Sequence, residues 1–286
     1  MVSWRDKLPI LLLALLVCGC CSEPEDSGYI SPDGFETAFE WVSVPAGEFL
    51  FGEHSAVTGL DYDYQMLKFE VTNAQYVRFL QAAFDDTLIT VGDTMVYGFY
   101  SGDSRWPAGN VPFARINRSD CRIAFTKGRF LIRRGYPYHP VVWVTWYGAQ
   151  AFASYYGASL PVAEEWEKAA RGGSRSCYPW GDMLDPARAN YRDNGDPFDN
   201  GTTPVGFFNG QTQRGFTTID SPSPYGAYDM AGNVWEWINS FAGSSSYRTI
   251  RSGSFALSPD YLRVTYYSLH FPNEMDPSYG FRIVRP

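Results

Sequence analysis

The sequence predicts a loop-rich globular domain in which short strands and three helices are mixed. Aromatic residues make up 17% of the 286 residues and charged residues only 19%, which is typical of a packed core and not of a disordered chain. In three segments, residues suited to a helix start precede apolar residues. From Cys177 onward glycine, asparagine, aspartate and proline are frequent, which favours long loops with few, short strands. No linker or internal repeat divides the chain, so we expect a single core.

The first residues have the pattern of a bacterial lipoprotein signal. Arg5 and Lys7 precede an apolar run from Leu8 to Val17. This run is about half as long as the roughly 20 residues that a membrane-spanning helix needs, so it fits the apolar part of a signal peptide. Gly19 places a small residue before Cys20, as at the cleavage and acylation site of lipoproteins. An ordinary cleaved signal with cysteines nearby is the alternative.

We therefore expect residues 1–19 to be a signal peptide, residues 20–40 a lipidated cysteine with its polar tether, and residues 41–286 the domain. Acylation of Cys20 would anchor the protein to a membrane through buried methylene groups. The expected location is the bacterial cell envelope, at the outer membrane or the periplasmic face. The net charge of −8 and the pI of about 4.9 argue against nucleic acid as a partner, since phosphate binding needs clustered Lys and Arg.

The domain is expected to begin in β structure. Residues 41–52 alternate apolar and small side chains around a Pro-Ala-Gly turn, which predicts a hairpin of two short strands. Thr72 and Gln75 have capping-box spacing and precede apolar residues at helical intervals, so a helix starts at Thr72. Residues 85–138 form an irregular elaboration with one predicted hairpin, whose turn is at residues 126–128.

Two further helices are predicted in the middle of the chain. Residues 139–145 form an extended run, and Thr145 can cap a helix that ends at Gly157. The third helix begins at Leu160-Pro161, with acidic residues near its positive end, and stops at Gly172-Gly173.

Segments spread over the domain resemble, in the same order, motifs of the formylglycine-generating-enzyme (sulfatase-modifying factor) family. They are Phe69-Glu-Val-Thr-Asn-Ala-Gln-Tyr76, Pro140-Val-Val-Trp-Val-Thr-Trp146, Leu160-Pro161, Glu165-Trp166-Glu167, Ala169-Ala-Arg-Gly-Gly173, Tyr178-Pro-Trp-Gly181, Tyr228-Asp-Met-Ala-Gly-Asn-Val-Trp-Glu-Trp237, Arg251-Ser-Gly-Ser-Phe255 and Gly280-Phe-Arg-Ile-Val284. The resemblance covers roughly Trp41 to Pro286. It implies the family's α+β fold, which is related to C-type lectins and has little regular secondary structure.

The resemblance also implies what this chain lacks. Formylglycine generation, as the family performs it, uses a pair of cysteines after a Gly-Ser-aromatic motif, because soft thiolates bind Cu(I). Here the motif is Gly253-Ser254-Phe255, and residues 256–263 contain no cysteine. We expect a member without the catalytic pair and without copper or iron. In a divergent enzyme, Ser254, Asp260 and Tyr261 would line the inherited cleft, although Ser254 can equally anchor the loop by a hydrogen bond.

Other residues suited to chemistry have simpler explanations. Cys121 and Cys177 lie outside the matching segment, and an exported protein permits a disulfide between them, which the sequence leaves open. The histidines 54, 139 and 270 are scattered and define no iron site, and His139 is expected to be structural. No Ser-His-Asp order, phosphate-binding loop or zinc spacing supports a hydrolase or a nucleotide enzyme. The glycosylation patterns at Asn117 and Asn200 are interpreted as turns.

A structural calcium ion is implied by two segments. The family's second calcium site matches two carboxylates and backbone carbonyls, an oxygen set that Ca²⁺ prefers. Its residues here are Asp229, Gly232, Val234 and Glu236. Another site would use Asn190 and Tyr191, completed by Asp196 or Asp199. In the alternative, Gly232-Asn233 is a tight turn and Glu236 pairs with an arginine.

Three functions follow as hypotheses. The missing cysteines favour a non-catalytic envelope domain that binds another protein or a glycan, with aromatic residues at 97–100 and 266–267 as a contact patch. The alternative is a divergent oxidase that modifies an exported substrate by a cysteine-independent route. A purely structural envelope component is the third.

Overall fold

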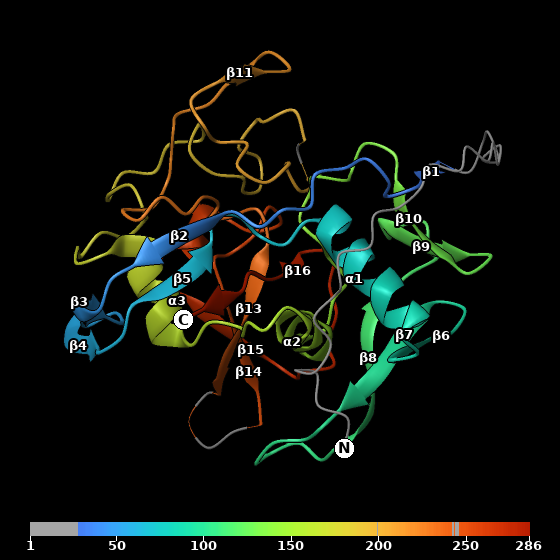
Figure 1. Cartoon of the computed structure of the whole chain (residues 1–286). Helices are drawn as coiled ribbons and strands as arrows, with labels where there is room; N and C mark the ends of the chain where they lie inside the picture. Colours follow the sequence, from blue (N-terminus) through green and yellow to red (C-terminus); the bar gives the residue numbers. More distant parts are fainter. Residues whose placement is uncertain (1–27, 199, 242, 244–245) are drawn as a thin grey trace.

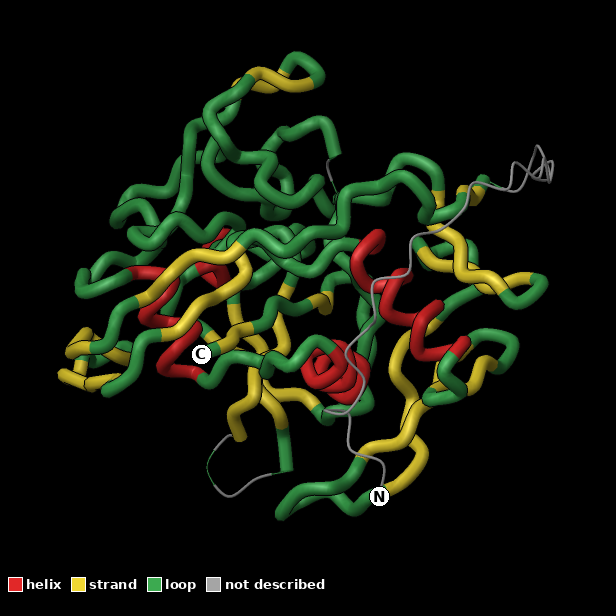
Figure 2. Tube along the Cα trace, viewed as in Figure 1, coloured by secondary structure: helices red, strands yellow, loops and turns green. Residues whose placement is uncertain are grey.

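The computed structural model describes residues 28–198, 200–241, 243 and 246–286. The expected signal peptide, Cys20 and the first part of the tether lie outside the described residues. The rest of the expected tether is part of the fold, because Tyr29–Ile30 form a strand and Phe35 and Phe39 pack against the core. Short strands and the helices α1 (Asn73–Asp85), α2 (Trp146–Tyr155) and α3 (Ala163–Arg171) are joined by long loops (Figures 1 and 2). The α+β, loop-rich fold class is confirmed. Within the described ranges, no helix has both the length and the apolar character needed to cross a membrane.

The strands of the described part form six small sheets. The four-stranded sheet has the order β15 (Tyr267–His270), β14 (Arg248–Arg251), β13 (Trp235–Phe241) and β16 (Tyr279–Gly280). Three-stranded sheets are β17-β5-β2 (Val284–Arg285, Tyr64–Leu67, Trp41–Val44), β6-β7-β8 (Ile89–Val91, Met95–Tyr100, Gly109–Arg115) and β1-β10-β9 (Tyr29–Ile30, Arg129–Arg133, Ile123–Thr126). The pairs are β3-β4 (Gly47–Phe51, Ala56–Leu60) and β11-β12 (Thr212–Gln213, Phe216–Thr217). Only β13 and β16 pair in parallel among these strands.

The four-stranded sheet lies between two parts of the core. Trp237 belongs to the large cluster that also contains α1 and α2 side chains such as Phe79 and Phe152. Its neighbour Ile238 belongs to a smaller cluster with Trp166 of α3. Because successive side chains of a strand point to opposite faces, α2 and α3 cover opposite faces of β13. The core is thus built on both sides of one sheet.

The predicted helices are present, and their starts follow local capping. Thr72 caps α1, accepting from the Gln75 backbone N–H at 3.2 Å while the Gln75 side chain accepts from the Thr72 N–H. Thr145 caps α2 by accepting from Gly148 N at 3.0 Å. The start of α3 was placed two to three residues too early, because Val162 is its N-cap and Pro161 precedes the helix.

The predicted hairpin at residues 41–52 is wrong in its pairing. Both strands exist, but β2 pairs with β5 and β3 pairs with β4. The carbonyl oxygens of Pro45 and Gly47 accept hydrogen bonds from Lys168 Nζ at 2.6 and 2.9 Å. The turn is therefore tied to α3, and each strand pairs with a different partner.

The elaboration at residues 85–138 is more regular than expected. The hairpin β9-β10 is confirmed, with Lys127 and Gly128 at positive φ in the turn. The unpredicted sheet β6-β7-β8 contains Gly98, where an added Cβ would lie 2.3 Å from the Phe113 ring. The extended run at 139–145 forms isolated bridges instead of a named strand, and Trp143 within it has a φ of 60°.

Candidate functional site

The segment after β14 folds back on itself. A Cβ on Gly253 would lie 2.8 Å from the Tyr261 carbonyl oxygen, and its φ is +71°, so the position requires glycine. The loop continues into the short 3-10 helix η2 (Pro259–Leu262). Ser254 is fully buried, and its Oγ accepts from Ala256 N at 3.3 Å. This contact matches the loop-anchor interpretation of Ser254.

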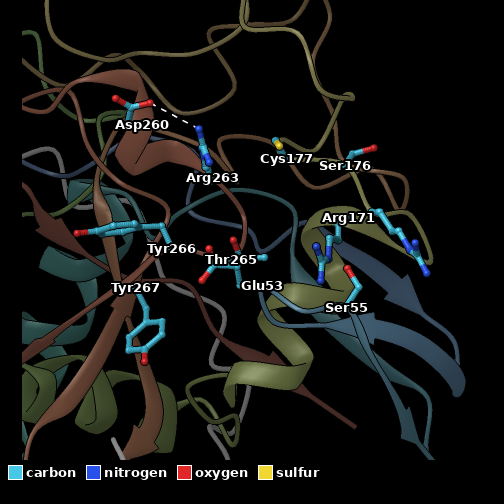
Figure 3. A pocket seen from close by; sticks show the side chains of 11 residues that line it. Glu53, Ser55, Arg171, Ser176, Cys177, Asp260, Arg263, Thr265, Tyr266 and Tyr267 are labelled. Carbon is cyan, nitrogen blue, oxygen red and sulfur yellow. Dashed lines mark ion pairs between the residues drawn. The ribbon is translucent and has the colours of Figure 1, made fainter.

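A cleft of about 660 Å³ lies beside this segment (Figure 3). It is bounded by the β3–β4 turn, the end of α3 with the residues after it, and the chain from η2 to β15. The lining residues are Glu53, Ser55, Arg171, Arg175, Ser176, Cys177, Asp260, Arg263, Thr265, Tyr266 and Tyr267. Of the expected cleft residues, Asp260 lines the cleft and Ser254 and Tyr261 do not, although the Tyr261 ring lies 4.9 Å from that of Tyr266.

The floor of the cleft is held by a buried ion network. Arg171 Nη2 donates to Glu167 Oε1 at 2.6 Å and also reaches the Leu50 and Gly52 carbonyls. The other oxygen of Glu167 accepts from Arg251 Nη1 at 3.0 Å. Two buried guanidiniums therefore share one carboxylate, and Arg171 of this network also lines the cleft.

Two more arginines line the cleft, one from the segment after α3 and one from the segment after η2. Arg175 is solvent-exposed, and no ion pair or hydrogen bond of its side chain is found among the described residues. Arg263 lies 3.7 Å from Asp260, with both side chains largely exposed. Sequence reasoning missed both arginines as cleft residues. The only local signal was the basic run from Arg171 to Arg175 just after a predicted helix.

The predicted option of a disulfide is not realised, because Cys121 and Cys177 are both free thiols. Cys121 is buried before β9, where burial raises the pKa of its thiol to about 11. Cys177 is half-exposed, lines the cleft, and is fixed to the opposite wall because its carbonyl accepts from Val264 N at 2.8 Å. The two cysteines belong to different parts of the fold.

The first calcium segment lies in a buried carboxylate cluster. Glu236 accepts two bonds from Arg282 at 2.8 Å, one to each oxygen, and a third from Trp166 Nε1 at 2.7 Å. Asp229 Oδ2 accepts from Gly206 N at 2.5 Å, and burial raises the pKa of this carboxyl to about 6. Burial, together with nearby Asp229 and Glu236, also raises the pKa of Glu70.

The donor set of this segment therefore fits calcium poorly as arranged. Both oxygens of Glu236 are occupied by Arg282, which is the arginine pairing considered as the alternative. Gly232 O accepts from Ser252 Oγ at 3.1 Å. The described residues also contain no group of three or more acidic, histidine or cysteine side chains suited to a metal. Arg282 was missed, although an arginine between two apolar residues signals a buried partner.

The second calcium segment adjoins the first. Asn190 O accepts from Asn233 N at 2.9 Å, and a Cβ on Gly232 would lie 2.3 Å from this oxygen. The Asn190 side-chain amide donates to Gly201 O at 2.9 Å. Tyr191 and Asp196 are both buried, whereas Asp199 lies outside the described residues. The calcium assignment here stays a prediction.

The histidines fall at separate places. His139 is buried beside Thr202 Oγ1 at 2.9 Å, and burial lowers its pKa to about 3. His270 links Ser268 Oγ (3.0 Å) to Glu274 Oε2 (2.7 Å), a spacing like that of a hydrolytic triad. The Tyr279 hydroxyl contacts both ring nitrogens as well, and the cleft does not reach Ser268. This network connects β15 to the segment that leads to β16.

Comparison with curated proteins places these features in a family context. The serine/threonine-protein kinase pkn1 of Chlamydia caviae is 30% identical over 309 aligned residues, which cover 99% of this chain and 43% of the kinase. The chain spans less than half the length of the pkn1 relatives that it matches. The formylglycine-generating enzyme of Streptomyces coelicolor is 29% identical, with 84% of this chain and 87% of the enzyme covered. The inactive C-alpha-formylglycine-generating enzyme 2 of Bos taurus is 35% identical over 50% of this chain and 49% of its own.

The fold comparison agrees with the sequence comparison. The structure of PvdO from Pseudomonas aeruginosa superposes with a TM-score of 0.60 at 20% identity, covering 90% of this chain and 97% of PvdO. The family sequence model of the sulfatase-modifying factor enzyme 1-like domain matches residues 27–286. The chain therefore belongs to the sulfatase-modifying factor family, whose named relatives include the formylglycine-generating enzymes.

Proposed function

We propose that this chain is a non-catalytic member of the family, anchored at the bacterial cell envelope through a lipid on Cys20, that binds a protein or glycan partner in the cleft. The observation that carries the proposal is the lining of the cleft. The segment after Gly253-Ser254-Phe255 contributes Asp260, Arg263 and tyrosines to this space, and no cysteine. Charged and aromatic side chains of this kind are suited to binding a ligand, whereas copper chemistry needs a pair of soft thiolates.

The remaining thiols do not replace the pair. Cys177 is on the cleft wall, but Cys121 is buried elsewhere, so the described part of the chain offers the cleft a single thiol. Loss of activity on this scaffold also has a parallel in the bovine relative that is named as inactive. Function on a shared fold is decided by the site, so the family alone does not imply oxidase activity.

The envelope location is supported by the signal-like residues before Cys20. Replacing Cys20 with Ser is expected to move the protein from the membrane fraction to the soluble fraction, because the acyl chains supply the membrane affinity. Intact-mass measurement of the wild-type protein should show the added lipid. An unmodified Cys20, or an unchanged fraction for C20S, would contradict the anchor.

The absence of catalysis is tested on a soluble form that starts at Glu23. This form keeps every helix, strand and core cluster of the described structure. With copper, oxygen and a cysteine-containing peptide, mass spectrometry should detect no aldehyde product, whereas the Streptomyces coelicolor enzyme serves as the positive control. Stoichiometric copper or an aldehyde product would overturn the proposal.

A divergent oxidase is the second candidate, and the position of Cys177 in the cleft favours it. A half-exposed thiol among arginines and beside Asp260 could serve as one ligand of a soft metal. Copper that binds the wild type but not Cys177→Ser would make this candidate the leading one.

A further inference from the structure

The cleft lining selects among partner classes. Its members are three arginines, two carboxylates, three hydroxyl residues of the Ser/Thr type, two tyrosines and one cysteine, with no aliphatic side chain among these described residues. Arginine and tyrosine are common at protein interfaces, but an aliphatic anchor of a protein partner would have no aliphatic side chain to pack against here. Sugars present hydroxyl groups that both donate and accept, which matches carboxylates, guanidiniums and hydroxyls. The lining therefore favours a glycan over a protein partner.

The charge of the cleft indicates an acidic glycan. Arg175 has no partner among the described residues. The carboxylate nearest to the Arg263 guanidinium is that of Asp260, at 3.7 Å, and both of these side chains are largely exposed. Such exposed pairs contribute little, so both guanidiniums can bind a ligand. Arg171 is the third arginine of the lining, so the arginines of the lining outnumber its carboxylates by three to two. This concentration occurs in a chain of net charge −8, and guanidinium forks match a carboxylate in two-point contact.

The tyrosines supply the surface for a sugar ring. Tyr266 and Tyr267 are 37% and 53% exposed, and Tyr267 lies on β15, the edge strand of the four-stranded sheet. Rings of Trp235 at 6.0 Å and Tyr261 at 4.9 Å hold the Tyr266 ring in place. Figure 3 shows both tyrosines on the side of the cleft opposite Arg171 and Ser55, with Arg263 and Asp260 above them. A sugar ring on a tyrosine face would therefore lie in the same cleft as the arginines.

We propose that the cleft binds an acidic oligosaccharide, with Arg175 and Arg263 on its carboxylates and a sugar ring against Tyr267. This rests on the proposed binding function and deepens it by naming the ligand class. The Asp260 and Glu53 carboxylates accept from sugar hydroxyls, which gives the site directional contacts besides charge.

Cys177 provides a reporter inside the site. In the form that starts at Glu23, the remaining thiols are Cys121, which is buried, and Cys177, which lines the cleft. Alkylation of Cys177 by iodoacetamide, followed by mass spectrometry, therefore reports on occupancy. Trigalacturonate at saturation is expected to slow this labelling at least about tenfold, and the neutral galactotriose should leave it unchanged. Titration calorimetry then gives the Kd of trigalacturonate.

Variants assign the contacts. Arg175→Ala and Arg263→Ala should each weaken trigalacturonate binding about tenfold, since a charge-assisted hydrogen bond contributes roughly 1.5 kcal/mol or more. Arg129→Ala is the matched control, because Arg129 is an exposed arginine far along the chain on β10. Tyr267→Ala should weaken binding several-fold, with Tyr138→Ala as control, because Tyr138 is also an exposed tyrosine and does not line the cleft. Melting temperatures near that of the wild type verify that all variants are folded.

The outcomes separate this inference from the proposed function. No protection by millimolar trigalacturonate, or equal affinity of Arg175→Ala and the wild type, would overturn the acidic-glycan assignment. Protection by galactotriose or by an acidic heptapeptide instead would also overturn it, but would leave a binding module. An aldehyde product in the copper assay would defeat the proposed function itself.

Discussion

Two arginines, Arg282 and Arg175, show how burial decides the role of one side chain. Arg282 is fully buried, and it donates to both oxygens of Glu236 and to the Tyr228 carbonyl at 2.8 Å. Arg175 is exposed beside the cleft and has no partner among the described residues. A buried guanidinium must be satisfied by the protein, whereas an exposed one in a concave surface retains its donors for a ligand. The first contributes to folding and the second to recognition.

The largest expected effect comes from removing the buried arginine. Arg282→Met leaves Glu236, Glu70 and Asp229 buried without their shared counter-charge. Breaking one partner of a buried pair costs about 3–5 kcal/mol, so the free energy of unfolding in urea should fall by that amount. Arg129→Met, at an exposed position, should change it by less than about 0.5 kcal/mol. Equal effects for the two variants would show that burial does not separate these arginines.

A measurement of bound calcium tests the role of the region around the buried carboxylates. We predict one equivalent of calcium at the Asn190 and Tyr191 segment, detected by elemental mass spectrometry before and after chelation. At a free concentration one hundred times Kd, a bound ion adds about 2.7 kcal/mol to stability, so chelation should lower the melting temperature. Two equivalents would require Glu236 to release Arg282, and no calcium at all would contradict the prediction. Magnesium in place of calcium is the control.

The buried carboxyls also predict an unusual pH dependence. Burial raises the pKa of Asp229 from 3.8 to about 6, with Glu70, Glu236 and Arg282 as the charged groups around it. The folded state thus binds this proton more tightly than the unfolded chain. Its stabilising contribution is fully present below about pH 4 and is lost as the pH rises through 6.

The expected loss is on the order of 3 kcal/mol, since the pKa differs by about two units and one unit corresponds to about 1.4 kcal/mol. Asp229→Asn should remove it, because an amide keeps the acceptor for Gly206 N without titrating. The measurement is the difference in the free energy of unfolding between the two proteins at several pH values from 4 to 7. A difference that does not vary with pH would contradict the raised pKa.

Local features of this fold could be predicted from the sequence, and distant pairings could not. The caps at Thr72 and Thr145 act within three residues of themselves, so spacing alone predicts them. The partners of β2 and β3 depend on which later strand returns beside them, which no local pattern contains. The family motifs were also local. Activity was harder to judge because it depends on which side chains meet in space.

The cleft illustrates the same limit for function. It combines a hairpin turn, the end of α3 and a segment near the C-terminus, which are separated by more than 80 residues. Of its two acidic members, Asp260 was predicted from the motif that it follows, and Glu53 was not. Arg175 and Cys177 had no motif of their own and were brought to the site only by the path of the chain after α3. Their roles therefore needed the structure.

The smallest effect is expected at Ser254, which distinguishes an anchoring residue from one that contacts ligand. Ser254→Ala removes the hydrogen bond to Ala256 N and should cost about 1 kcal/mol of unfolding free energy, because the partly buried amide loses its acceptor. Ligand protection of Cys177 should persist in this variant, since Ser254 does not line the cleft. A Ser254→Ala protein that is as stable as the wild type but no longer protects Cys177 would instead place the serine in the site. The cleft would then extend to the Gly-Ser-aromatic motif, and Ser254 would contact the ligand instead of only anchoring the loop.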